Sequence, residues 1–151
     1  MRFATLGSLL TGRLGPSFIA PSASAREAVC QLQEGNLRAA VVMRQAPPVH
    51  IVTDRHIVES VVAQRRDADA VTALQVSAPT ESFEPTTTLD VAWNRVREKN
   101  LPWIAVREGD RVLALVSRTE LLEWVVRSQE AEVDCAIGAV KQFALSNRRP
   151  R

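Results

Sequence analysis

The sequence predicts an α/β (α+β) fold in which two similar units share one core. The main observation is an internal repeat, because adding 64 to the residue numbers superimposes residues 49–59 on residues 113–123. Both copies run from apolar residues into a hydroxyl residue, Thr53 or Ser117, and then into a helical pattern of apolar residues. The match continues without a gap outside this motif, in pairs such as Ala28 and Ala92, Glu34 and Glu98, Asn36 and Asn100, Val42 and Val106, and Val61 and Val125.

Composition places the chain among ordinary soluble globular proteins. It has 151 residues, of which 46% are hydrophobic and 24% charged, and a net charge of +2. A net charge this small produces no broad electrostatic attraction for polyanions, so nucleic acid is disfavoured as a partner. The basic stretch of residues 148–151 is interpreted as a solvated tail. The absence of a long uncharged apolar span predicts a cytoplasmic protein without membrane contact. Cys30 and Cys135 lack the spacing of a metal site or a disulfide framework.

The elements of the first unit follow from start and stop signals. Ser22 or Ser24 can cap a helix that Gly35 is expected to end, and Ser24 with Glu27 has the spacing of a capping box. The apolar residues 37–43 predict a strand, and a proline pair separates it from a second strand over residues 49–52. The helix after the motif and a polar loop then close the unit.

The second unit repeats this order. Ser82-Phe83 aligns with Phe18-Ile19, in the short strand that opens each unit. Residues 101–106 and 111–116 predict two strands joined by Gly109-Asp110, a turn signal typical of a hairpin. A further amphipathic helix is expected after the second unit, because apolar residues recur there at steps of three and four.

The two motifs resemble those of a tandem CBS-domain module, also called a Bateman module and named after cystathionine β-synthase. The family motif is a glycine, two apolar residues, Thr or Ser, two variable residues and Asp. This chain has His50-Ile51-Val52-Thr53-Asp54-Arg55-His56 and Ala114-Leu115-Val116-Ser117-Arg118-Thr119-Glu120. The hydroxyl position matches twice, whereas both glycines and both final Asp residues are replaced. The resemblance implies two β-α-β-β-α units packed as a pseudo-twofold pair, residues 6–66 and 70–127, followed by a tail helix and basic tail over residues 128–151.

The resemblance also implies two clefts between the units, in which the family binds adenosine nucleotides. Carried over residue by residue, the first cleft consists of Thr53, Asp54, Arg55, His56, Phe18, Ile19, Arg38 and Ala39. The second consists of Ser117, Arg118, Thr119, Glu120, Ser82, Phe83, Pro102 and Trp103. AMP, ATP or a similar molecule is the expected regulatory ligand, and no cofactor, metal or catalytic residue is expected.

Helix capping explains the same hydroxyl residues without any ligand. Thr53 is a strong N-cap, worth about 1 kcal/mol, and Ser117 with Glu120 has the spacing of a capping box. A capped helix N-terminus also suits a phosphate, so both interpretations stand. Glu120 keeps a carboxylate for ribose hydroxyls and His56 suits a phosphate, which favours the second cleft for an adenosyl group. Trp103 either stacks on a base or packs in the core.

Two functions are compatible with these features. The first is a non-catalytic regulatory module that binds an adenosine-containing ligand and signals by a conformational change. The second is a ligand-free pair that acts as a dimerisation or protein-interaction scaffold, with the C-terminal helix recruiting a partner. An enzyme is disfavoured because the sequence lacks a nucleophile–base pair and a glycine-rich phosphate loop. We expect a homodimer through the helices after the motifs, which would otherwise expose the apolar residues Val61, Val62, Trp124 and Val125.

Overall fold

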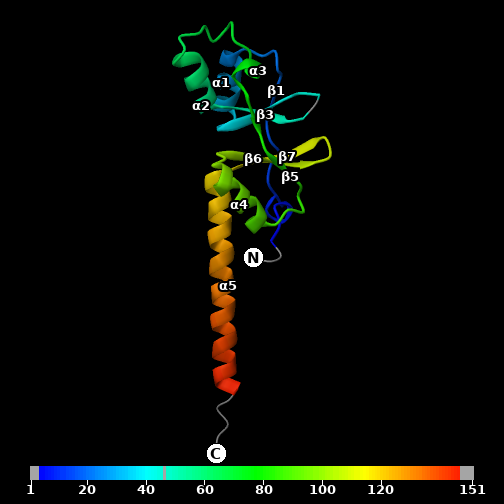
Figure 1. Ribbon diagram of the computed structural model, residues 1–151, viewed down its shortest axis with the longest axis vertical. Helices are drawn as coiled ribbons and strands as arrows, with labels where there is room; N and C mark the ends of the chain where they lie inside the picture. The colour runs from blue at the N-terminus through cyan, green and yellow to red at the C-terminus, as the bar shows by residue number, and fades with distance from the viewer. Residues whose placement is uncertain (1–3, 46, 147–151) are drawn as a thin grey trace, which may run out of the picture.

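The computed structural model describes residues 4–45 and 47–146, and it has two small β-sheets stacked at the centre with helices beyond them (Figure 1). The first sheet has the order β1 (Phe18–Ile19), β2 (Ala39–Val42), β3 (Val49–Thr53) and β4 (Ala78–Thr80). The second has the order β5 (Ser82–Phe83), β6 (Trp103–Glu108) and β7 (Arg111–Ser117). The α/β fold of two repeated units is therefore confirmed.

The strand pairing repeats between the two sheets. β1 pairs in parallel with β2, and β2 pairs antiparallel with β3. In the same way, β5 pairs in parallel with β6, which pairs antiparallel with β7. The turn between β6 and β7 contains Gly109 at φ 58°, a backbone conformation that favours glycine. The first sheet gains one more strand, because β4 pairs antiparallel with β3.

The helices also follow the repeat. They are the 3₁₀ turn η1 (Gly7–Leu9), α1 (Ala25–Glu34), α2 (Asp54–Ile57) with its π-helical continuation η2 (Val58–Val62), α3 (Ala73–Val76), α4 (Leu89–Lys99) and α5 (Arg118–Ser146). The capping box of Ser24 and Glu27 forms as predicted. Gly35 is right-handed at φ −81°, and the left-handed residues after α1 and α4 are Asn36 and Asn100, at φ 50° and 51°. The repeat therefore extends to the helix ends as well as the strands.

Successive side chains of each strand point to opposite faces of its sheet, and this alternation divides the buried apolar residues into three clusters. Val42 and Val52 point into a first core beneath α1, and their counterparts Val106 and Val116 point into a second core beside α4. The residues on the opposite faces meet between the sheets: Ala39, Val41, Ile51, Ala105 and Leu115. Both faces of each sheet are therefore covered, one by helices and the other by the second sheet.

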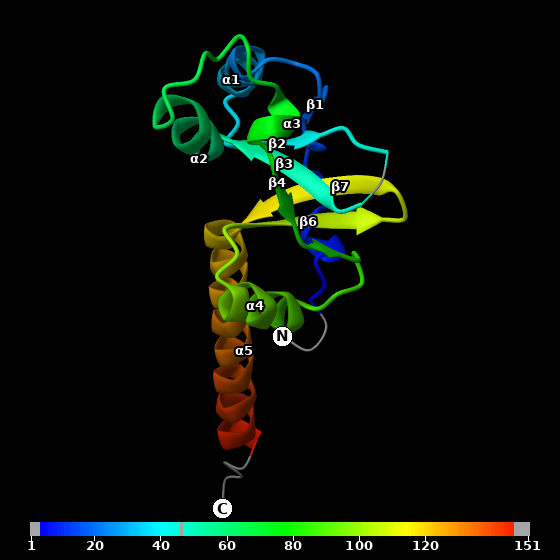
Figure 2. The ribbon, with the colours of Figure 1, turned by 45° about the horizontal axis from the view of Figure 1, so that its top comes forward.

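Each unit is completed by a segment from the sequence range that was assigned to the other unit. Leu6, next to η1, is fully buried in the second core, and backbone bonds hold this segment to Thr87 and Leu89. Conversely, Ala73 of α3 is fully buried in the first core. The chain therefore crosses between the units twice, once before β1 and once before β5 (Figure 2).

The expected exposure of Val61 and Val125 on the helix surfaces was wrong. Val61 and Val125 are 5% and 4% exposed and belong to the cores. Val62 is exposed as expected, whereas Trp124 is partly buried against the second core. The other exposed apolar residues in these parts of the helices are Val58, Leu122 and Val126. The prediction assigned Val61 and Val125 to the wrong face of each helix, because the residue at which a helix starts decides which of its residues face the sheet. The expected C-terminal helix is present, as the outer part of α5, which continues from the second motif without a break.

The exchanged N-terminal segment makes Leu6→Ala a test of the packing. Removing this buried side chain should lower the free energy of unfolding by about 2–4 kcal/mol, because it leaves a cavity in the second core. Leu14→Ala is the matched control, since Leu14 is 91% exposed and its loss should cost less than about 0.5 kcal/mol. Chemical denaturation measures both variants, and equal costs would contradict the exchange.

Candidate functional site

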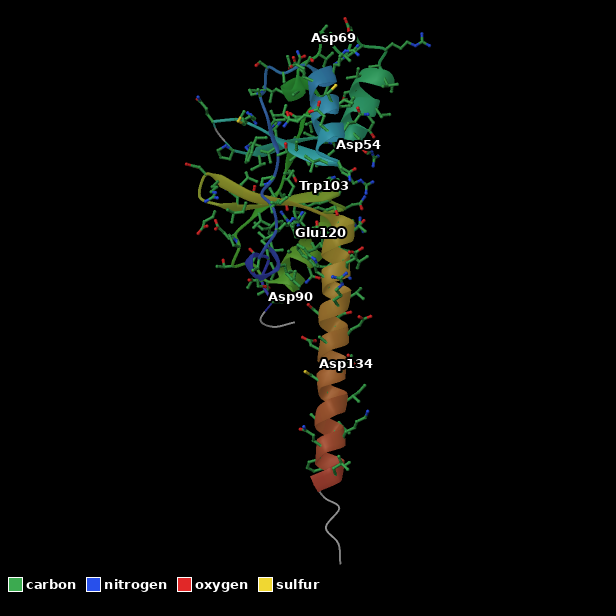
Figure 3. All side chains as sticks on the ribbon, turned by 180° about the vertical axis from the view of Figure 1, so that it is seen from behind. Asp54, Asp69, Asp90, Trp103, Glu120 and Asp134 are labelled. Atoms are coloured by element: carbon green, nitrogen blue, oxygen red, sulfur yellow. The ribbon has the colours of Figure 1, made fainter. Side chains whose placement is uncertain are left out.

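One cleft of about 440 Å³ joins the two motifs. It opens where β3 and β7 run into α2 and α5, so residues 53–56 and 117–119 line the same space. Figure 3 shows Asp54 of one unit on the same side of the molecule as Trp103 and Glu120 of the other. The remaining lining residues are Arg38, Ile51, Ala78, Pro79, Thr80, Leu101, Pro102 and Trp103. The resemblance assigned the motifs to separate clefts, whereas this cleft brings both junctions together.

Both motif hydroxyls cap the helices that follow them. Thr53 Oγ1, in a residue that is 4% exposed, accepts a hydrogen bond from the His56 backbone N–H at 3.2 Å. Ser117 Oγ accepts one from the Glu120 backbone N–H at 3.1 Å. The capping interpretation is therefore confirmed, and each hydroxyl still has its own proton to donate towards the cleft.

The carboxylate of Glu120 is engaged by the N-terminal segment. Arg13 Nη1 lies 2.5 Å from Glu120 Oε1, and Arg13 Nη2 donates to the Leu115 carbonyl at 2.8 Å. The same guanidinium lies 6.0 Å from the centre of the Trp124 ring, within range of a cation–π interaction. Ser117 and Glu120 therefore form only half of the expected capping box. Glu120 does not line the cleft, and a ribose would have to displace Arg13 to reach it.

Positive charge dominates the lining of this cleft. Arg38, Arg55 and Arg118 contribute guanidinium groups, against the single carboxylate of Asp54. Arg118 donates to the side chain of Asn100, and Arg55 pairs with Glu59 at 2.7 Å, which lowers the pKa of Glu59. No described residue forms an ion pair with Arg38. The arrangement favours an anionic ligand.

The two histidines differ in their partners. His56 lines the cleft half-buried, and its Nδ1 has no hydrogen-bond partner among the described residues. Burial lowers the pKa of His56, which makes it neutral near pH 7 and a weaker anchor for phosphate than its charged form. His50 Nδ1 lies 3.0 Å from Ser77 Oγ, and burial, followed by the charge of Arg44, lowers its pKa. His50 lies on β3 and is not among the residues that line the cleft.

Several residues carried over from the family lie elsewhere. Ile19 belongs to the first core, Ala39 is buried between the sheets, and Phe83 packs against the second core. Neither Ser82 nor Phe18 is among the residues that line this cleft. Phe18 and Ser82 lie on β1 and β5, the two-residue strands that open the units.

Sequence reasoning also missed two residues that contribute to the cleft or bind a residue of its motifs. Thr80 lines the cleft from β4, and its hydroxyl donates to the Trp103 carbonyl at 2.9 Å. Arg13 reaches Glu120 from a position more than 100 residues away. No local pattern marks either residue, because both act through contacts between distant parts of the chain.

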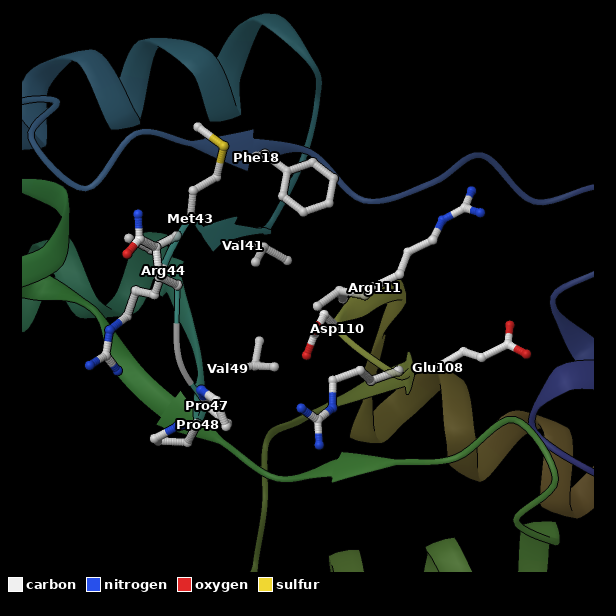
Figure 4. A pocket seen from close by; sticks show the side chains of 14 residues that line it. Phe18, Val41, Met43, Arg44, Pro47, Pro48, Val49, Glu108, Asp110 and Arg111 are labelled. Carbon is white, nitrogen blue, oxygen red and sulfur yellow. The ribbon is translucent and has the colours of Figure 1, made fainter.

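A second, larger cavity of about 670 Å³ lies at the opposite ends of the strands, between the β2–β3 and β6–β7 hairpins (Figure 4). Phe18, Val41 and Val49 form apolar parts of its wall. Its charged residues are Arg44, Arg107, Glu108, Asp110 and Arg111. Although this cavity is larger, it contains neither motif and mixes carboxylates with guanidinium groups. The smaller cleft is therefore the better candidate for an anion.

Residues 4–45 and 47–146 offer no grouped set of metal ligands. Within that part of the chain, no three His, Cys, Asp or Glu residues lie close enough together to hold a metal ion. None of the helices in those ranges combines the length and apolar character needed to cross a membrane. The basic residues 148–151 lie outside the described residues.

Comparisons with known proteins agree with the two-unit fold. No protein-family model matches the sequence, and no curated protein matches it. Among solved structures, a hexameric CBS-CP12 protein from bloom-forming cyanobacteria has a TM-score of 0.72 at 19% identity, covering 99% of this chain and 88% of its own. A putative signal-transduction protein with CBS domains from Burkholderia ambifaria has a TM-score of 0.71 at 21% identity, covering 83% and 96%. A CBS-domain protein from Agrobacterium tumefaciens has a TM-score of 0.66 at 18% identity, covering 79% and 96%. The chain therefore has the fold of a tandem CBS-domain module.

The histidines predict a dependence of stability on pH. Their pKa values are lowered in the folded state, so the unfolded chain binds more protons below the ordinary value of about 6.5. The free energy of unfolding should therefore fall as the pH drops from about 7 to about 5. Urea titrations at constant ionic strength measure this slope, and the double variant His50→Gln, His56→Gln should flatten it. An unchanged slope in that variant would assign the effect to other groups.

Proposed function

We propose that this chain is a non-catalytic regulatory module that binds an adenosine-containing nucleotide in the 440 Å³ cleft and signals through a change in the relative position of its two units. One observation carries the proposal: the strand–helix junctions of both units, with their hydroxyls and three arginines, line one cleft. A pocket of this volume falls within the range that holds small ligands.

The lining offers partners for the phosphate and the base of a nucleotide. Arg38 and Arg118 supply charge for phosphate oxygens, and the hydroxyls of Thr53 and Ser117 supply further donors. Trp103, which is partly buried at the edge of the cluster between the sheets, offers an aromatic face for a base. These groups explain binding and include no arrangement suited to covalent chemistry.

The position of the cleft supports a signalling role. Its walls come from both units, so a ligand contacts two bodies at once and favours the relative position that fits it best. The contact between Arg13 and Glu120 adds the N-terminal segment to the same region. A ligand that alters this contact would also alter how the segment lies across the second unit.

The alternative is a ligand-free scaffold, and two observations favour it. Glu120 is already occupied by Arg13, and exposed apolar residues remain on the helices after both motifs. The similar CBS-CP12 protein from bloom-forming cyanobacteria is hexameric, which supports assembly of this chain with copies of itself. Both functions are compatible with a homodimer.

Calorimetric titration with AMP, ADP and ATP separates the two functions. We expect one of these ligands to bind, and a hundredfold excess over its Kd to raise the free energy of unfolding by about 2.7 kcal/mol. Arg38→Ala and Arg118→Ala should each weaken binding about tenfold or more, since a hydrogen bond to a charged group is worth about 1.5–3 kcal/mol.

Arg107→Ala is the matched control, because Arg107 lines the larger cavity at the other end of the strands. The affinity of this variant for the nucleotide should equal that of the unchanged chain. A loss confined to Arg107→Ala would place the ligand in the larger cavity, and no binding of any nucleotide at millimolar concentration would favour the scaffold.

A further inference from the structure

The larger cavity, of about 670 Å³, has a mostly apolar lining with charged residues on one side. Its apolar wall comes chiefly from the first unit, through Phe18, Val41, Met43 and Val49. Figure 4 shows Phe18, Val41 and Val49 facing the charged residues of the β6–β7 turn across the cavity. Phe18 and Met43 are 45% and 49% exposed, so the protein itself covers only part of these large apolar side chains. The wall therefore offers an apolar surface that a ligand can cover.

A β-bulge in the second sheet places an arginine and an apolar residue on the same side of the cavity. The pairing of β6 with β7 shifts its register after Val106, and Leu113 is left out of the pairing. Because of this shift, Val112 packs against the cluster between the sheets, where strict alternation from Leu115 would place Leu113. Arg107 lies directly opposite Val112, and both residues line the cavity. The bulge therefore adds a guanidinium group to the inner side of the second sheet.

The charged residues of this cavity are free to meet a ligand. Arg107 is partly buried, and its guanidinium forms no ion pair with any described residue. The same is true of the exposed side chains of Arg44, Glu108, Asp110 and Arg111. A charge that is partly removed from water is stabilised by an opposite charge. A bound anion would supply the partner that Arg107 lacks.

The geometry points to a small amphipathic carboxylate as the ligand of the larger cavity, with its apolar body on the wall of the first unit and its carboxylate on Arg107. The planar guanidinium of an arginine matches a carboxylate through two parallel hydrogen bonds. Three arginines against two carboxylates leave the lining with one excess positive charge. This balance suits a ligand with a single negative charge and disfavours a polyphosphate. The volume falls within the range of small-ligand sites.

This site is separate from the cleft proposed for a nucleotide. The two cavities share no lining residue and open at opposite ends of the strands. Residues of both units wall the larger cavity, so a ligand there contacts the β2–β3 and β6–β7 hairpins together and favours the separation that fits it best. Binding of the carboxylate does not depend on a nucleotide, and either proposal can fail without the other.

Calorimetric titration of the full chain with octanoate tests the ligand class. Octanoate carries an apolar body and one carboxylate, whereas acetate has only the carboxylate and 1-octanol only the body. Octanoate should bind at least about tenfold more tightly than either of these probes, because each lacks one of the two contacts. Equal affinity for octanoate and 1-octanol, equal affinity for octanoate and acetate, or no binding of octanoate at millimolar concentration would overturn the proposal.

Two variants test whether octanoate binds in this cavity. Arg107→Ala should weaken octanoate binding about tenfold or more, since it removes hydrogen bonds to a charged group. Arg97→Ala is its matched control, because Arg97 is exposed on α4 and lines neither cavity. Met43→Glu places a carboxylate in the apolar wall and should weaken octanoate binding by a similar factor. Its control is Val91→Glu, which changes another exposed apolar residue, on α4.

Urea denaturation shows that each variant is folded before its affinity is measured. Both control variants should bind octanoate as the unchanged chain does. An unchanged octanoate affinity in either cavity variant, or an equal loss in its control, would place octanoate elsewhere and overturn the proposal.

Discussion

The contact between the two sheets is the interaction on which the rest of the structure depends. Val41 and Ile51 of the first sheet pack against Ala105 and Leu115 of the second, and all are buried. Each sheet has only three or four short strands, too few to bury both faces within a single unit. The stacked sheets supply the missing cover for each other. Their packing also fixes where the cleft must open, at the strand ends where the sheets diverge into helices.

Much of the fold could be predicted from the sequence because its signals are local or periodic. The repeat at a distance of 64 residues places β1 on β5 and Asn36 on Asn100, and the structure keeps both equivalences. Two features were beyond such reasoning. The burial of Leu6 in the second core depends on how the chain crosses between units, and an apolar residue carries no mark of which core it will join. The phase of the helix around Val61 depended on its start and on the π-helical turn that follows.

The candidate site shows the same division between local and distant determinants. The capping roles of Thr53 and Ser117 follow from a hydroxyl that precedes a helix, and the structure contains both hydrogen bonds. The partner of Glu120 is Arg13, whose position next to the second unit is set by the exchanged N-terminal segment. A motif therefore indicates which residues are available to a ligand, whereas the tertiary structure decides which of them are already engaged.

The exchange of opening segments has a consequence for the order in which the protein is made and folds. The Leu89 backbone N–H donates to the Ala4 carbonyl, so the segment around Ala4 must wait until Leu89 has been synthesised before its binding surface exists. The first unit closes earlier, because α3 follows its strands closely in the sequence. Contacts between such distant residues slow folding, since a long loop must close before they are formed. A cut between the two repeats would therefore separate each core from a segment that it needs, although the repeat suggests two independent pieces.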